Sequence, residues 1–286
     1  MRLTVTFAAV LALAGCVIVV PDGKADYRWS SSSSIQGNGS SATETRSANS
    51  VVAVRIENRR RVDMEVDVRV GGASTLTVEG DSNLLPYVHT DLDGDTLRIS
   101  TDEDLRSGAP IRVLLTVPRL RELASTGSVQ VDVNGLNGGA LRVSHTGSGR
   151  VAMHGRLDDL NLDHTGSGSF TGDGLESRTA NVNMVGSGRI DLGTLRGDAL
   201  RVNSTGSGGF YARGAVHRLD VQTQGSGGVY LSELHAEVAN LSSSGSGGIT
   251  AWVSQKVDAH GNGSGGIQVS GNPAQRNVSG RRTTIQ

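Results

Sequence analysis

A Gly-Ser-Gly motif returns at an almost constant interval from residue 125 onward in this 286-residue chain. Successive first glycines are 20, 19, 20, 20, 19, 20 and 18 residues apart, and they are Gly127, Gly147, Gly166, Gly186, Gly206, Gly225, Gly245 and Gly263. The first copy, "TGSVQV", lacks the second glycine. A fixed period near this length is typical of a solenoid, in which each repeat packs only against its neighbours.

The copies, aligned on their first glycine, share columns of apolar residues. Six residues before the glycine stand Leu141, Leu160, Ala180, Leu200, Leu219, Ala239 and Val257. Four before it stand Val143, Leu162, Val182, Val202, Val221, Leu241 and Ala259. The position between these two columns is polar, with Arg142, Asn161, Asn181, Arg201, Asp220, Asn240 and Asp258. Four after the glycine stand Val151, Phe170, Ile190, Phe210, Val229, Ile249 and Ile267.

This alternation is typical of strands that turn one side toward a core. Each repeat therefore predicts one strand, the Gly-Ser-Gly, and a second strand, with successive copies stacked about 4.8 Å apart. The predicted fold class is all-β, a right-handed parallel β-helix of coils of about 20 residues. Eight such coils would make a rod of roughly 38 Å.

The composition suits a thin core and excludes one class of partner. Aromatic residues make up only 3% of the chain, whereas glycines number 40, so Val, Leu, Ile and Ala must fill the interior. The 27 basic and 28 acidic side chains nearly cancel. Because nucleic-acid binding needs a concentrated basic surface, no nucleic acid is expected as a partner.

The N-terminus has the pattern of an exported, lipid-anchored protein. Residues 1–15 combine Arg2, an apolar run and a small-residue end, and Leu-Ala-Gly directly precedes Cys16. This ending resembles a bacterial lipoprotein signal, so Cys16 is the predicted lipid attachment site. An ordinary secretory signal with an incidental cysteine is the alternative. Val17, where some lipoproteins have Asp, favours the outer membrane if the organism is Gram-negative.

Three further segments are predicted after the signal. Residues 16–50 are rich in Ser and Gly and are expected to form a flexible tether. Residues 51–124 alternate apolar and polar residues without a repeat, so they predict an N-terminal β segment that covers one end of the solenoid. Residues 125–286 predict the repeat β-helix, and the polar tail is expected to form a C-terminal cap.

The order of these segments resembles one known family. "EGDSNLLPYVHTDLDGDTLRIS" is followed by "PIRVLLTVPRLRELASTGSVQV", the Gly-Ser-Gly repeats, and a closing "GNP" and "VSG". Over about residues 51–281 the chain is similar to the GIN domain family, a domain of unknown function that is also described as an auto-transporter adhesin head. The resemblance implies a right-handed β-helix in bacterial envelope proteins and an adhesive role. It brings no catalytic residues.

No motif for catalysis or for a cofactor is found. Strands, rather than helices, follow the glycines, and no phosphate-binding G-x-x-x-x-G-K-[ST] occurs. His145 and His164 share one column two residues before the glycine, where they are interpreted as solvated side chains near a turn rather than as metal ligands. The candidate carboxylates for a sugar-cleaving pair are Asp158, Asp159, Asp163 and Asp191, but acidic residues at turns, such as Asp158 and Asp159, are common without a function. No enzyme activity, cofactor or metal is expected.

The remaining candidate is the motif serine column: Ser148, Ser167, Ser187, Ser207, Ser226, Ser246 and Ser264. If strand alternation continues through the motif, these serines face outward and form a hydroxyl ladder. A bend at the glycines is favoured, because doubled glycines weaken a flat strand, and a bend lets the serines turn inward as structural groups.

The leading functional hypothesis is a non-enzymatic binding or adhesion module tethered in the cell envelope through lipidated Cys16. Its ligand would be an envelope glycan or protein. The alternatives are a structural or assembly component of the envelope and, third, a carbohydrate-active enzyme.

Overall fold

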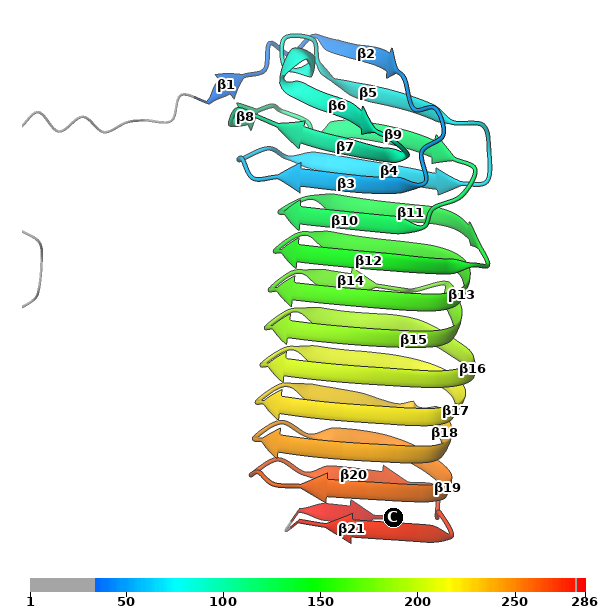
Figure 1. The fold of residues 1–286 in the computed structure, drawn as a ribbon. Helices are drawn as coiled ribbons and strands as arrows, with labels where there is room; N and C mark the ends of the chain where they lie inside the picture. The colour runs from blue at the N-terminus through cyan, green and yellow to red at the C-terminus, as the bar shows by residue number, and fades with distance from the viewer. Residues whose placement is uncertain (1–33, 281) are drawn as a thin grey trace, which may run out of the picture. The chain divides into compact units, whose positions relative to one another are not determined.

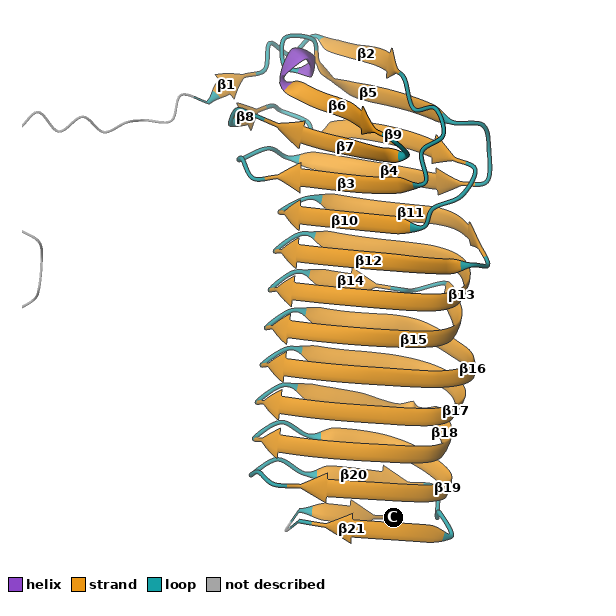
Figure 2. Cartoon of the chain, in the orientation of Figure 1, coloured by secondary structure: helices purple, strands orange, loops and turns teal. Residues whose placement is uncertain are grey.

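The computed structural model describes residues 34–280 and 282–286, of which Ser34–Gln286 form one compact unit. The predicted signal peptide, Cys16 and the first part of the predicted tether lie outside the described residues. The compact unit is a parallel β-solenoid built from stacked two-strand coils, as the sequence predicted (Figure 1). Among the described residues, the one helix is a 3-10 turn, η1, at Leu85–Tyr87 (Figure 2).

The Gly-Ser-Gly repeats form the long body of the solenoid. Its strands are β10 (Glu122–Gly127), β11 (Gln130–Asn137), β12 (Ala140–Gly147), β13 (Arg150–Gly166), β14 (Ser169–Thr171), β15 (Leu175–Gly186), β16 (Arg189–Gly206), β17 (Gly209–Gly225), β18 (Gly228–Gly245) and β19 (Ile249–Gly261). Strands β10, β12, β13 and β15 to β18 end at the first glycine of a motif, and the longest strands bend around the opposite edge of the coil (Figure 1). Each first glycine from Gly127 to Gly225 pairs with that of the next coil, so the repeat sets the register.

The core lies between the two strand layers. All residues of the three apolar columns are buried, and the side chains of Phe170 and Phe210 are the largest among them. The intervening polar column lies outside, exposed or half-buried. One further column faces inward. It stands two residues before the first glycine and consists of Ser125, His145, His164, Met184, Ser204, Thr223 and Ser243. We call it the inner turn column.

The segment 51–124 supplies coils as well as a cover. Its elements are β3 (Ala53–Asn58), β4 (Met64–Val70), β5 (Thr75–Asp81), β6 (Val88–Asp93), β7 (Thr96–Thr101), β8 (Leu105–Arg106) and β9 (Ile111–Val117). Strands β3 and β4 pair in parallel with β10 and β11, while β7 and β9 pair in parallel with the other sides of β3 and β4. Strand β3 therefore lies between β7 and β10, although it precedes both in sequence.

The prediction that residues 16–50 form a flexible tether is wrong over its second part. Strand β1 (Ile35–Gln36) pairs with β8, and β2 (Ser41–Arg46) pairs antiparallel with β5. Polar composition did not prevent this, because a strand edge recruits another strand through backbone groups. The Arg46 guanidinium also donates to the backbone oxygens of Leu85 and Val88.

The C-terminal residues extend the stack. Strand β20 (Ile267–Ser270) and β21 (Gln275–Ser279) pair with β19, and β22 (Thr283–Ile285) pairs with β20. The tail predicted as a cap thus forms a last short coil, with the same parallel pairing as the coils before it.

Candidate functional site

The chain turns sharply at each Gly-Ser-Gly. The first glycines from Gly127 to Gly245 have φ between 104° and 142°, a conformation that favours glycine. The carbonyl oxygen of Gly186 accepts hydrogen bonds from the backbone N–H groups of Ser207, at 2.9 Å, and Gly208, at 3.2 Å. The same pair of bonds recurs at every motif from Ser148 to Gly247, and in the last motif Gly265 alone donates to Gly245. The ladder of backbone hydrogen bonds therefore continues through the turns.

The second glycine of the motif is required by close packing between coils. A Cβ added at Gly227 would lie 2.3 Å from the carbonyl oxygen of Gly208 in the preceding coil. At Gly188 it would also lie 2.3 Å from Nε2 of His164. The structure thus explains both glycines of the motif: the first adopts a positive φ, and the second leaves no room for a Cβ.

The serines between these glycines face outward. The favoured expectation, that a bend turns them inward, is half wrong: the chain bends, but all seven motif serines are exposed. The physical reason is that the second glycine already packs on the coil below, which leaves only the outer side of the turn for the serine side chain. None of the seven hydroxyls hydrogen-bonds to another side chain or backbone group among the described residues.

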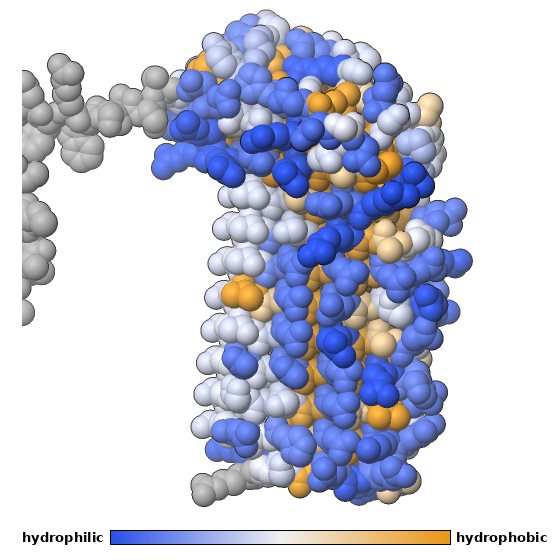
Figure 3. All heavy atoms as spheres, in the orientation of Figure 1, coloured by the Kyte–Doolittle hydropathy of each residue, from blue (hydrophilic) through white to orange (hydrophobic). Residues whose placement is uncertain are grey.

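A second exposed column runs beside the serines. It stands one residue before the first glycine and comprises Thr146, Thr165, Val185, Thr205, Gln224, Ser244 and Asn262. We call the two columns together the hydroxyl edge. It appears in Figure 3 as a mostly pale border of intermediate hydropathy along the repeat coils. None of its residues is charged. Val185, which is 49% exposed, is its one large apolar side chain.

The neighbouring sheet face presents polar ladders in which side chains are already paired. Asn203 donates to Asn183 at 2.9 Å, and Asn183 donates to Asp163 at 2.8 Å. On later coils, Asn240 donates to Asp220 at 2.6 Å. Because these groups satisfy one another between coils, they are less available to a ligand than the unpaired serines.

The structure buries the two histidines of the inner turn column. His145 is fully buried and His164 is 1% exposed, so their interpretation as solvated side chains is wrong. Their rings lie side by side on adjacent coils, with centroids 5.1 Å apart, and Nε2 of His145 lies 3.1 Å from the Gly149 oxygen. The missed signal was the alternation itself, since the column is two residues beyond a buried one.

Burial lowers the pKa of both imidazoles. For His164 the pKa falls to about 4, with burial as the first cause and the neighbouring His145 as the second, while the Gly168 carbonyl opposes both. For His145 burial lowers the pKa and the Gly149 carbonyl opposes it. Ser125 and Met184 lie beside the pair in the column. Within the described residues no group of three His, Cys, Asp or Glu side chains could hold a metal ion.

The four candidate carboxylates do not converge on one cleft. Asp158 accepts a hydrogen bond from the Gly139 N–H at 2.7 Å, and Asp159 accepts one from the Thr179 hydroxyl. Asp163 belongs to the polar ladder, whereas Asp191 accepts from the Gly193 N–H at 3.2 Å. Each carboxylate therefore has a local structural partner on a different part of the coil surface.

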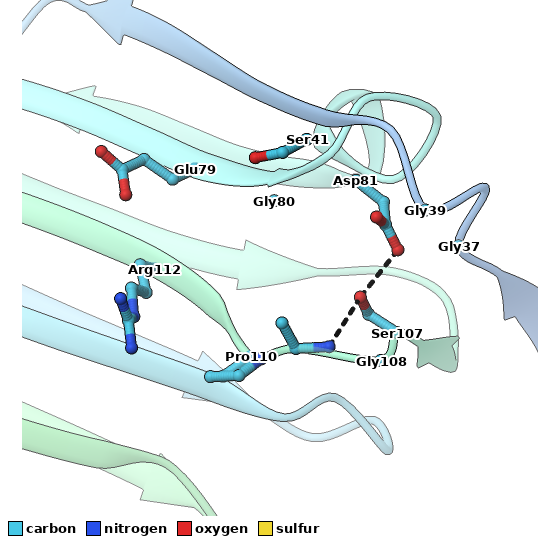
Figure 4. A pocket seen from close by; sticks show the side chains of 11 residues that line it. Gly37, Gly39, Ser41, Glu79, Gly80, Asp81, Ser107, Gly108, Pro110 and Arg112 are labelled. Atoms are coloured by element: carbon cyan, nitrogen blue, oxygen red, sulfur yellow. Dashed lines mark hydrogen bonds between the residues drawn. The ribbon is translucent and has the colours of Figure 1, made fainter.

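A cavity of about 450 Å³ lies at the N-terminal end, between β2, β5 and the segment before β9 (Figure 4). Its lining includes Glu79, Asp81, Ser107 and Arg112. The Ser107 hydroxyl donates to Asp81 at 2.7 Å, and Arg112 forms an ion pair with Glu65 at 3.1 Å. Its polar groups are thus largely paired within the protein.

Comparison with solved structures shows the same fold in several bacterial proteins. A "putative adhesin" from Parabacteroides merdae superposes with a TM-score of 0.71 at 18% identity, over 82% of this chain and 98% of that one. A "putative lipid binding protein" from Parabacteroides distasonis gives 0.61 at 22% identity, over 88% and 96%. A "putative adhesin" from the same species gives 0.60 at 18% identity, over 88% and 99%.

The sequence comparisons identify the family. No curated protein matched the chain. No helix among the described residues is both long and apolar enough to cross a membrane. The sequence profile described as "Putative auto-transporter adhesin, head GIN domain" matches twice, over residues 56–175 and 160–273. With most of the solenoid covered by these two matches, the chain belongs to the GIN domain family.

Proposed function

We propose that this protein is a non-enzymatic adhesion module of the cell envelope, and that its hydroxyl edge binds a repetitive hydroxylated polymer such as an envelope glycan. One observation carries the proposal. Seven serine hydroxyls are exposed at the same point of successive coils and have no hydrogen-bond partner among the described residues.

The geometry of the edge suits a repetitive ligand. Its hydroxyls recur at the coil spacing of about 4.8 Å, and each can both donate and accept a hydrogen bond. When one serine hydroxyl exchanges its hydrogen bond to water for one to the ligand, the binding free energy gains only about 1 kcal/mol. Measurable affinity therefore requires hydrogen bonds from several coils at once. The largely uncharged edge favours a neutral hydroxylated chain over a strongly charged one.

The envelope location rests on the N-terminal sequence and on the family description. Leu-Ala-Gly before Cys16 supports lipid attachment there, and the family is described as adhesin heads. A lipidated Cys16 would hold the solenoid at a membrane, with the residues up to 33 as the connection.

The test is binding of residues 34–286, which contain the whole described core, to peptidoglycan sacculi and to arrays of immobilised bacterial polysaccharides. The triple variant Ser187→Ala, Ser207→Ala, Ser226→Ala should bind at least tenfold more weakly, because it removes hydroxyls from three adjacent coils. The matched control is Asn161→Ala, Asn181→Ala, Asn240→Ala on the polar face, which should keep its binding.

Two results would contradict the proposal: no binding to any polymer, or loss of binding in the control triple alone. In cells, Cys16→Ser in the full chain should abolish fatty-acid incorporation and release the protein from membranes. One stoichiometric envelope protein cross-linked to the chain, with no polymer bound, would favour the assembly role instead.

A further inference from the structure

A second column of side chains lies on the edge opposite the Gly-Ser-Gly turns. Arg196, Ala215, His235 and Trp252 stand in register on successive coils of β16 to β19. The His235 and Trp252 rings stack with centroids 4.2 Å apart and planes inclined by 22°. Gly271 also packs close to the Trp252 ring, since a Cβ added there would lie 2.8 Å from Cε2. The column therefore contains one stacked pair, and Ala215 separates this pair from Arg196.

Ala215 leaves a notch between Arg196 and this stacked pair. A cavity of about 500 Å³ lies there, and its lining includes Arg196, Ala215, His235 and Glu237. Arg196 and His235 are two coils apart, or roughly 9.6 Å at the usual strand spacing. One planar ring at the level of Ala215 would have the guanidinium on one face and the imidazole on the other, each about 4.8 Å from its centre.

The same three coils show a filled version of this arrangement on the adjoining sheet face. Cζ of Arg189 lies 4.2 Å from the centre of the Tyr211 ring, and Tyr211 stacks on Tyr230 with centroids 4.9 Å apart. Tyr211 belongs to the same strand, β17, as Ala215, and Arg189 to the same strand, β16, as Arg196. At these spacings a tyrosine ring fits between an arginine and an aromatic ring. The notch has the arginine and the imidazole, but no ring lies between them.

The wall beside the notch offers a hydrogen-bond acceptor. Glu237 is held in place by His217, whose Nδ1 lies 2.9 Å from Oε2, and by Gln255, whose Nε2 donates to Oε2 at 3.0 Å. Both donors use the same oxygen, so Oε1 accepts no hydrogen bond from the described residues. A ligand with a hydroxyl on its ring could donate to Oε1.

We propose that this notch binds a tyrosine side chain of a protein partner. The ring stacks between Arg196 and His235, and the phenol hydroxyl donates to Glu237. Delocalised planar groups form the two walls, and such groups pack best on another planar ring. A sugar ring, which is puckered, matches these walls less well. The site lies apart from the hydroxyl edge and does not depend on the glycan proposal.

Tryptophan fluorescence tests the site directly. The chain has two tryptophans, Trp29 and Trp252, so in residues 34–286 the emission comes from Trp252 alone. With excitation where tyrosine does not absorb, N-acetyl-tyrosinamide should change this emission in a saturable way, with a dissociation constant on the order of 1 mM. N-acetyl-phenylalaninamide should bind several-fold more weakly, and methyl glucoside should leave the emission unchanged.

Three variants complete the experiment. Ala215→Tyr should fill the notch and abolish the response, whereas the control Ala140→Tyr, at an exposed alanine of β12, should respond like the wild type. Glu237→Leu removes the hydrogen-bond acceptor, so the tyrosine and phenylalanine probes should then bind about equally. This variant tests the proposal even if Ala215→Tyr does not fold.

The proposal is overturned if Ala215→Tyr still responds, if the two amino-acid probes do not differ in the wild type, or if methyl glucoside is the better ligand. The triple serine variant of the hydroxyl edge should keep the fluorescence response, so failure of either proposal leaves the other intact.

Discussion

At the scale of single residues, two side chains of the inner turn column show how a polar group is accommodated inside this solenoid. The Ser243 hydroxyl donates to the Gly247 oxygen at 3.2 Å, and Nε2 of His145 lies 3.1 Å from the Gly149 oxygen. In each case the side chain reaches the carbonyl of the second glycine in its own coil. Buried polar groups are tolerated when they find such partners. His145 and Ser243 thus contact the turn from inside the coil, whereas the buried Ser125 hydroxyl of the same column has no hydrogen-bond partner among the described residues.

His164 makes stability depend on pH. Its pKa is about 4 in the folded protein and about 6.5 when unfolded, so between these values the unfolded chain binds more protons. Stability is therefore full above the unfolded pKa and falls by about 3 kcal/mol as the pH drops to the folded pKa. His164→Met, which copies Met184 of the next coil, should remove most of this fall.

Urea unfolding at about pH 7 and about pH 4.5 measures the difference. His145 stays in the variant, so a small residual pH dependence from its lowered pKa is expected. Equal losses of stability in wild type and variant would show that His164 is not the titrating group.

At the scale of elements, the Gly-Ser-Gly turn is the unit that repeats. Its first glycine supplies the positive φ, its second lets one coil approach the next, and its serine is left on the outside. The strands on either side can stay in register only because every turn follows the same path. The repeat is thus a backbone requirement, while the serine side chain is free to take another role.

Gly227→Ala tests the close approach without the effect of a positive φ. The new Cβ would meet the backbone of Gly208, which cannot move without disturbing a whole coil. We expect a loss of about 3 kcal/mol in the free energy of unfolding, as for other overpacked sites. Gly108→Ala is the control, because an added Cβ there meets nothing within 4 Å. Equal stabilities of the two variants in urea would contradict this account.

At the scale of the whole molecule, the N-terminal end of the solenoid is closed by antiparallel strands. Strand β5 pairs with β9 on one side and with β2 on the other, so β2 is the strand that covers the edge of β5. Uncovered strand edges invite association with other chains. Residues that look like a linker in sequence therefore form the outer strand at this end of the folded unit.

Removal of β2 should expose this edge. A chain from residue 51 to 286 should unfold at least about 5 °C below the chain from residue 34 to 286, and it should associate as its concentration rises. Thermal scans and light scattering at several concentrations measure both effects. If the two chains unfold at the same temperature and remain monomeric, β2 is dispensable.

Much of the solenoid follows from local rules that the sequence displays. Strand alternation places Leu200 and Val202 inside and Arg201 outside, and it does the same for the equivalent residues of the other copies. The glycine period determines which residues of neighbouring coils lie above one another. The same alternation, extended one step, would also have placed His145 and His164 inside. These features depend on neighbours within a coil or one coil away, so the spacing of residues is enough to derive them.

By itself the sequence determined the parallel β-solenoid, its register, its core columns and the need for glycine at each turn, since one repeating local geometry governs them all. Only the tertiary structure decided the rest. It paired the Ser41–Arg46 strand with β5, inserted β3 between β7 and β10, and turned the motif serines outward. It also showed that Ala215 leaves a gap between Arg196 and His235. The pairings of β2 and β3 arise between segments that carry no repeat, so spacing in the sequence does not indicate them. The direction of the serines depends on the backbone path through the turn, and the gap at Ala215 depends on which side chains stack on neighbouring coils, so both are decided by three-dimensional packing.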